Sequence, residues 1–194
     1  MVYFTSDLHL GHSKVLPIRP MFHGDIEAHD EYLISMFNQR VRNKDEVYIL
    51  GDLCFRSTKP VEYYLERLHG RKHLIVGNHD ISWMEGVDEL SKWFETVDNL
   101  RVIKHEKKRL TLCHYPLLEW SGSRYPEAHT SYLIHGHLHN SRDRNSYGVI
   151  KEFLPHALNC GVDVNGYMPV TFDELLENCN RFYERVSESE ETEQ

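Results

Sequence analysis

Potential metal ligands recur along this chain in five short motifs, and each motif follows a run of apolar residues. The motifs are Asp7-Leu8-His9, Gly51-Asp52, Gly77-Asn78-His79-Asp80, His114 and Gly136-His137-Leu138-His139. Together they supply carboxylate oxygens, imidazole nitrogens and an amide oxygen, which are the ligand types that hard and borderline divalent metals select. A carboxylate has two oxygens, so it can bridge two cations and leave room for a shared water. The motifs therefore predict a two-metal hydrolytic centre.

Each motif alone also has an ordinary structural interpretation. Asp7-Leu8-His9 fits a turn that caps the next helix, Gly51-Asp52 is a common turn signal, and a lone His114 is more often an interior histidine. The pair His137 and His139 is more specific, because imidazoles two positions apart project to the same side of an extended backbone and can reach adjacent metals. Ordinary turns do not end five apolar runs with a ligand, so the combination favours a metal centre.

The apolar runs predict the strands that must position these ligands. They cover residues 2–4, 47–50, 73–76, 110–113 and 132–134. Each run is rich in β-branched, aliphatic or aromatic residues and ends at a motif, as expected for strands whose carboxyl ends meet at one sheet edge. In open α/β sheets that edge is where ligands bind.

The segments between the runs predict the remaining elements. Apolar residues recur at helical spacing over 26–41, Pro60 opens a helix that Gly70 closes, and a short helix is expected around 87–94. A final helix begins at Thr171, where the sequence fits a capping box with Glu174.

The second half of the chain is richer in strands. Residues 101–106 and 109–113 predict a hairpin joined at Lys107-Lys108, and strands follow at 131–134 and about 156–160. A first half of βα units and a second half of strands predict an α/β (α+β) fold in which two sheets pack face to face with helices outside.

Composition bounds the class of protein. The 194 residues suit one domain, expected over 1–186, followed by an acidic tail at 187–194 that is expected to be disordered. The net charge of −8 argues against long nucleic acid as a partner, although two bound cations would reverse the sign locally. The sequence has no secretory signal and no run of membrane-spanning length, so a cytoplasmic protein without a membrane partner is expected. Four scattered cysteines indicate buried thiols.

In order and spacing, the five motifs resemble those of the calcineurin-like metallophosphoesterase superfamily, which read D-x-H, G-D, G-N-H-[DE], H and G-H-x-H. The resemblance covers residues 2 to about 163 and is nearest to small single-domain bacterial and phage members, which share segments such as Arg19-Pro20 and Asn159-Cys160-Gly161-Val162-Asp163. It implies a four-layer sandwich of two mixed β-sheets flanked by helices.

The resemblance also implies a role for each motif residue. The first metal would be held by Asp7, His9, Asp52 and His139. The second would be held by Asp52, Asn78, His114 and His137, so that Asp52 bridges. His79 would not bind metal but would lie over the phosphate, where it would stabilise charge or protonate the leaving oxygen. Asp80 would orient His79 by accepting its other ring proton.

Other residues near the motifs have less specific signals. Arg19 and His12 are candidate substrate contacts; a surface arginine in a proline-rich loop and a polar turn residue are the structural alternatives. Asn159 and Asp163 are expected to form hydrogen bonds near the site on the resemblance alone.

The implied activity is hydrolysis of a phosphate ester by a metal-bridging hydroxide, with the two cations about 3.5–4 Å apart. Mixed oxygen and nitrogen ligands favour manganese, iron or zinc, with nickel or magnesium usable in vitro. Without a cap segment in the sequence, a phosphodiesterase acting on a nucleotide or a nucleic-acid end is expected.

The alternatives are a phosphomonoesterase or protein phosphatase, and a non-catalytic scaffold of the same fold. The residues after Gly51-Asp52 lack the arginine-bearing motif of the protein phosphatases, and the presence of His79 argues against a scaffold. The oligomeric state is left open.

Overall fold

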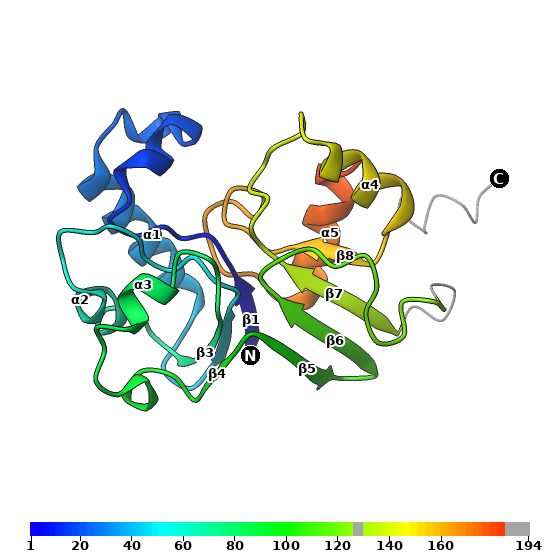
Figure 1. The fold of residues 1–194 in the computed structure, drawn as a ribbon, viewed down its shortest axis with the longest axis horizontal. Helices are drawn as coiled ribbons and strands as arrows, with labels where there is room; N and C mark the ends of the chain where they lie inside the picture. Colours follow the sequence, from blue (N-terminus) through cyan, green and yellow to red (C-terminus); the bar gives the residue numbers. More distant parts are fainter. Residues whose placement is uncertain (126–129, 185–194) are drawn as a thin grey trace.

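Two four-stranded sheets form the centre of the computed structural model, which describes residues 1–125 and 130–184 (Figure 1). The first sheet has the order β1-β2-β3-β4, with bounds Val2–Thr5, Glu46–Ile49, Arg71–Ile75 and Thr96–Asp98. The second has the order β5-β6-β7-β8, with bounds Leu100–His105, Lys108–Cys113, Ser131–His135 and Ala157–Asn159. All neighbours in the first sheet are parallel, whereas β5 and β6 are antiparallel in the second, so only the second sheet is mixed.

Within residues 1–125 and 130–184, five α-helices and three short 3-10 segments accompany the sheets. The α-helices are α1 Ile26–Arg40, α2 Val61–Leu65, α3 Ile81–Met84, α4 Asn145–Phe153 and α5 Phe172–Phe182. The 3-10 segments are η1 Ser13–Ile18, η2 Pro20–Phe22 and η3 Leu90–Lys92. In Figure 1, α1, α2 and α3 lie with the first sheet, and α4 and α5 lie with the second.

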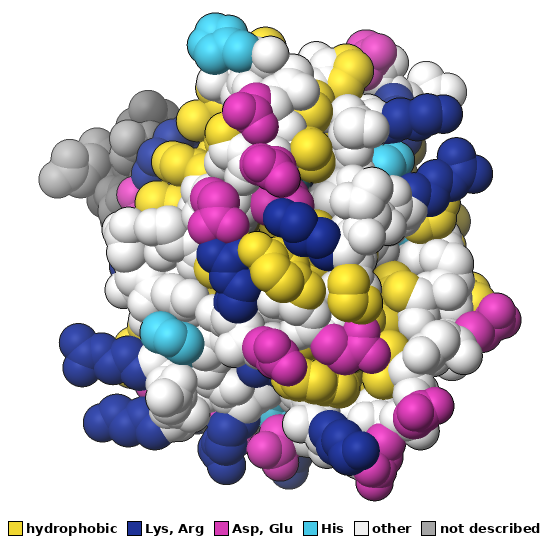
Figure 2. Space-filling model, turned by 90° about the vertical axis from the view of Figure 1, so that its left-hand side faces the viewer, with side chains coloured by type: hydrophobic (Ala, Val, Ile, Leu, Met, Phe, Trp, Pro, Cys, Tyr) yellow, Lys and Arg dark blue, Asp and Glu magenta, His cyan; other side chains and the backbone are white. Residues whose placement is uncertain are grey.

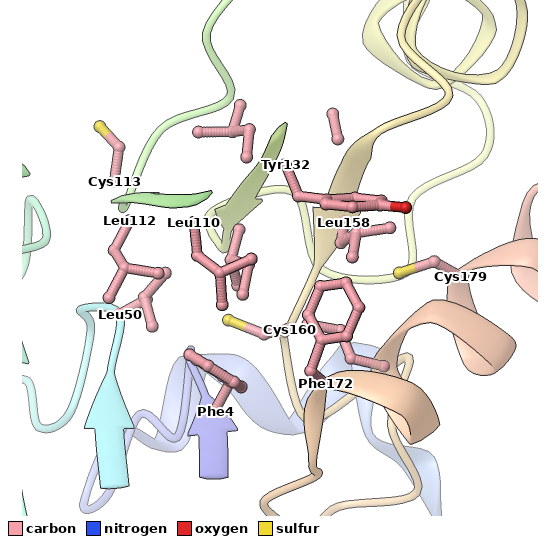
Figure 3. Packing of buried hydrophobic residues seen from close by; sticks show 14 of the residues in the cluster. Phe4, Leu50, Leu110, Leu112, Cys113, Tyr132, Leu158, Cys160, Phe172 and Cys179 are labelled. Carbon is pink, nitrogen blue, oxygen red and sulfur yellow. The ribbon is translucent and has the colours of Figure 1, made fainter. Parts of the chain in front are cut away.

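Alternation along the strands explains how the layers pack. On β2, Val47 and Ile49 pack in the cluster that contains the apolar residues of α1 and α2. Tyr48 packs in a second cluster, together with Phe4 of β1 and Leu110 of β6. Figure 3 shows this second cluster, where side chains of the two sheets meet beside α5. Because both faces of β1 and β2 are covered, the apolar residues of these strands are consecutive: Val2 to Phe4 in β1 and Val47 to Ile49 in β2.

Helix ends follow the local sequence. Asp25 caps α1, because its carboxylate accepts hydrogen bonds from the backbone amides of Glu27 and Ala28 at 2.9 and 3.0 Å. The predicted capping box at α5 is confirmed: Glu174 accepts from the backbone amide of Thr171 at 2.8 Å. Such caps satisfy amides that the first helical turn leaves without partners.

Several expected elements differ from those observed. The helix expected around 87–94 is wrong, since the chain there contains only η3, and α3 precedes it. β4 and α4 were not expected: β4 has three half-buried residues, and α4 contains Gly148 and lacks a side-chain cap. The tail at 187–194 lies outside the described residues.

Two further properties follow from the described part of the chain. Within it, no helix is long and apolar enough to cross a membrane. All four cysteines are free and buried, as expected, and burial raises the pKa of the Cys54 thiol to about 12.

Candidate metal centre

The loops that follow β1 and β2 continue to pair beyond the ends of their strands. The backbone amide of Asp7 donates to the carbonyl of Gly51 at 3.0 Å, and that of His9 donates to the carbonyl of Asp52 at 2.9 Å. On the other side, Ser6 forms a parallel bridge with Gly161. These contacts hold the first two motifs side by side at the carboxyl ends of the strands.

Five of the seven predicted metal ligands have a left-handed backbone. Their φ angles are +58° at Asp7, +51° at His9, +55° at Asp52, +69° at His137 and +51° at His139. For residues other than glycine this conformation costs about 1 kcal/mol or more at each position. It persists only where surrounding contacts fix it, and it turns these side chains away from the strand direction toward one another.

Glycines in the motifs permit close approach of the two halves of the site. Gly51 has a φ of +85°, and a Cβ there would lie 2.5 Å from Nδ1 of His114. A Cβ at Gly136 would overlap Oγ of Ser6, which itself donates to the Asp7 carboxylate at 2.7 Å. Space therefore requires a glycine at both positions, and backbone conformation requires one at Gly51 as well.

The first group of ligand atoms comes from Asp7, His9 and His139, which lie within 4.8 Å of one another. Nε2 of His9 is 3.3 Å from Nε2 of His139. The Asp7 carboxylate also accepts from the backbone amide of His137 at 3.1 and 3.0 Å, which ties the first motif to the last. Burial raises the pKa of the Asp7 carboxyl above its ordinary value, so a nearby cation would stabilise its charged form.

The second group comes from Asp52, His114 and His137, again within 4.8 Å. Oδ1 of Asn78 lies 3.1 Å from Nε2 of His114 and 3.0 Å from Nδ1 of His137. The structure thus brings together all the side chains predicted for the second metal.

Asp52 lies between the two groups. Its Oδ1 accepts the backbone amide of His79 at 2.9 Å. Its Oδ2 is 3.6 Å from Nε2 of His9 and 3.6 Å from Nε2 of His114. One oxygen therefore fixes the loop, and the other faces ligands of both groups.

The tautomer of the His114 ring indicates that the ligand atoms of the second group are arranged to bind a cation. Nδ1 of His114 donates to the carbonyl of Leu50 at 2.8 Å, so Nε2 of the neutral ring carries a lone pair. That lone pair faces another acceptor, Oδ1 of Asn78, at 3.1 Å. Two acceptors face one another in this way when a cation binds both, and donors about 2.1 Å from a shared metal lie about 3.0–3.4 Å apart. The residues therefore fit two divalent metals.

A buried carboxylate orients His139. Nδ1 of His139 donates to Oδ2 of Asp163 at 2.7 Å, and this hydrogen bond leaves Nε2 free to face the site. Burial alone would raise the pKa of Asp163, but hydrogen bonds from His139 and Arg19 hold it well below its usual value. Asn159 donates to the carbonyl of His139 at 2.9 Å, so both residues expected near the site do form hydrogen bonds there.

His79 lies beside the first group, with its side chain 29% exposed. Its Nε2 is 3.9 Å from Oδ2 of Asp52, and its ring is 5.3 Å from that of His9. The ring of His12 is 5.8 Å away, so His12 is also at the site. The ring of Phe55 is 4.1 Å from that of His79. Sequence reasoning did not select Phe55, because a single aromatic residue after Gly-Asp carries no distinctive signal.

The role expected for Asp80 is wrong. Its Oδ2 accepts the backbone amides of Asp52 and Gly77 at 2.9 and 2.8 Å. Its Oδ1 accepts the amide of Leu53 and the indole N–H of Trp83, both at 2.9 Å. The fully buried carboxylate therefore holds the backbone of two motifs and not the ring of His79.

The expectation that Arg19 contacts substrate is also wrong, because its side chain is fully buried. The guanidinium donates to the carbonyls of Asp7 and Leu8 at 2.6 and 2.9 Å and to both oxygens of Asp163. Arg19 thus supports the first motif from behind.

Comparisons with known proteins agree with this geometry. The family model described as calcineurin-like phosphoesterase matches residues 1–182. An uncharacterized protein of Methanocaldococcus jannaschii is 29% identical over 90% of this chain and 89% of its own. The Gene 66 protein of Mycobacterium phage L5 is 28% identical over 94% and 95%. A crystal structure of a protein of unknown function from Aquifex aeolicus, 27% identical, superposes with a TM-score of 0.69 over 91% of this chain and 98% of that one. The chain belongs to the calcineurin-like phosphoesterase family.

Proposed function

We propose that this phosphoesterase is a two-metal phosphodiesterase. The observation that carries the proposal is the position of Asp52, whose Oδ2 faces ligands of both groups at equal distances of 3.6 Å. A carboxylate oxygen so placed can bind two cations at once. The mixed oxygen and nitrogen donors favour manganese, iron or zinc, because carboxylate and amide oxygens suit manganese and imidazoles suit iron and zinc.

The reaction divides between the metals and the protein. Two bound cations would bind the phosphate and supply a nucleophilic water near neutral pH. Asp163 keeps His139 in the tautomer with Nε2 toward the site, and Leu50 does the same for His114. His79, partly exposed and beside Asp52, can reach the leaving oxygen and donate a proton as the phosphorus–oxygen bond breaks.

Open surroundings on two sides of the site support a diester substrate. Tyr115, 44% exposed, has its ring 4.8 Å from that of His137. Phe55 stands on the other side, against His79. Asn78 is itself exposed. A phosphate bound between the two groups therefore has room for one substituent toward Tyr115 and another toward Phe55. A nucleotide or a nucleic-acid end would supply both.

The test compares bis-(p-nitrophenyl) phosphate with p-nitrophenyl phosphate, each with manganese, nickel, zinc and magnesium. We expect faster hydrolysis of the diester, fastest with manganese. A monoester preference of about tenfold, which corresponds to about 1.4 kcal/mol in barrier, would overturn the diesterase assignment. Binding of two metals without hydrolysis of either ester would instead favour a scaffold.

A further inference from the structure

A pocket of about 570 Å³ lies beside His79, between the loop after β2 and the segment around α3. Residues that line it include Phe55, Arg56, Lys59, Trp83 and Val87. Its volume falls within the range of small-molecule sites in proteins. Because Phe55 both lines the pocket and packs against the ring of His79 at 4.1 Å, the pocket adjoins the proposed proton donor.

We propose that this pocket binds the leaving group of the substrate, and that this group is a nucleoside carrying a further phosphate. The inference rests on the proposed function, in which His79 protonates the leaving oxygen. The departing part of the ester must then lie on the His79 side of the phosphate, where Phe55 packs against His79 and lines the pocket.

The pocket combines an apolar wall with cationic groups. Phe55, Trp83 and Val87 supply apolar surface for a sugar and a base. Arg56 lies at the exposed rim with its guanidinium 5.0 Å from the centre of the Phe55 ring. Its backbone φ is +48°, which is an uncommon conformation for a residue other than glycine. Apolar and aromatic surface beside a guanidinium is the chemistry that recognises nucleotides.

The charges around the pocket favour an anion. Among residues 1–125 and 130–184, no carboxylate pairs with Arg56 within 4.0 Å, so its charge is available to a ligand. Lys59 lies 3.7 Å from Glu27, a largely exposed side chain, and Glu62 is the acidic residue of the lining. A phosphate on the leaving group can accept two hydrogen bonds from Arg56.

The surface around α2 sets a limit on substrate length. Figure 2, which views the side where α2 lies in Figure 1, shows acidic and basic side chains interspersed with hydrophobic ones. A continuous duplex would need a track of cations to neutralise successive phosphates. A short nucleotide with one terminal phosphate fits this mixed face better.

The experiment uses three dinucleotides: one without a terminal phosphate, one with a 5′-phosphate and one with a 3′-phosphate. We expect a terminal phosphate at one end to raise kcat/KM by about tenfold in the manganese-loaded wild type. Arg56→Gln should abolish that preference. Arg42→Gln, which alters an exposed arginine before the amino end of β2, should retain it.

Binding to the metal-free protein separates the pocket from the chemistry. Calorimetry should detect a nucleoside 3′,5′-bisphosphate in the wild type and in Arg42→Gln, with about tenfold weaker binding in Arg56→Gln. Hydrolysis of the dinucleotides without any effect of the terminal phosphate would contradict the proposed leaving-group pocket but not the proposed diesterase activity. Arg56-dependent binding without hydrolysis of any diester would support nucleotide binding in the pocket and contradict the proposed diesterase activity. A higher kcat/KM for a 20-nucleotide strand than for both phosphorylated dinucleotides would contradict the proposal that the substrate is short.

Discussion

The guanidinium of Arg19 binds the carboxylate of Asp163 through two hydrogen bonds, Nε to Oδ1 at 2.8 Å and Nη2 to Oδ2 at 2.9 Å, and both side chains are fully buried. The same Oδ2 accepts from Nδ1 of His139. The pair therefore connects the interior behind the first motif to the orientation of a predicted metal ligand.

Arg19→Met should destabilise the protein by about 3–5 kcal/mol, because it leaves the buried Asp163 without its cation. Chemical denaturation in chelator measures this without a contribution from metal. Arg42→Met, at an exposed position, should change stability by no more than about 0.5 kcal/mol. A free energy of unfolding for Arg19→Met within 1 kcal/mol or so of the wild type would contradict the supporting role.

Asp52→Asn should weaken both metals and abolish activity, because Oδ2 of Asp52 faces both ligand groups. Asp7→Asn should mainly empty the first position, since Asp7 belongs to one group. Metal analysis after equilibrium dialysis distinguishes the two variants, and the exposed Asp88→Asn serves as the matched control. Two tightly bound metals in Asp52→Asn would show that this residue does not bridge.

His79→Ala should lower kcat by about 10²–10⁴, the contribution of a positioned general acid, while metal content stays unchanged. The loss should shrink for esters with acidic leaving groups, which need little protonation to depart. Rates across a series of substituted phenyl diesters test this, with the exposed His69→Ala as control. Loss of a metal in His79→Ala would make His79 a ligand, consistent with its place 3.9 Å from Oδ2 of Asp52.

Asp80→Asn should destabilise the fold by about 2 kcal/mol or more, because an amide nitrogen cannot accept from the buried donors that now bind the carboxylate. Metal affinity should fall with it, since Asp80 fixes the amide of Asp52. Thermal unfolding and metal titration measure both effects, with Asp88→Asn as reference. A variant of normal stability and metal affinity that lost only kcat would contradict this role and would instead indicate that Asp80 orients His79.

Much of the architecture could be predicted from the sequence. The five apolar runs correspond to β1, β2, β3, β6 and β7, because strands covered on both faces need continuous apolar residues. The helix expected over 26–41 corresponds to α1, whose apolar residues recur at helical spacing. β4 escaped detection because three half-buried residues leave no periodicity.

By itself, the sequence determined which residue types end each strand, and hence that carboxylates and imidazoles must meet at one edge. Only the tertiary structure decided what each residue does there. Arg19 and Asp80 lie within motif segments, but sequence spacing does not report burial. Their donors and acceptors belong to segments distant in the chain, such as Asp163 for Arg19 and Asp52 for Asp80. Phe55 and Arg56 acquire their proposed role because the loop after β2 and the segment around α3 line one pocket. Local pattern fixes the ligand types, and long-range packing fixes which side chains face the site.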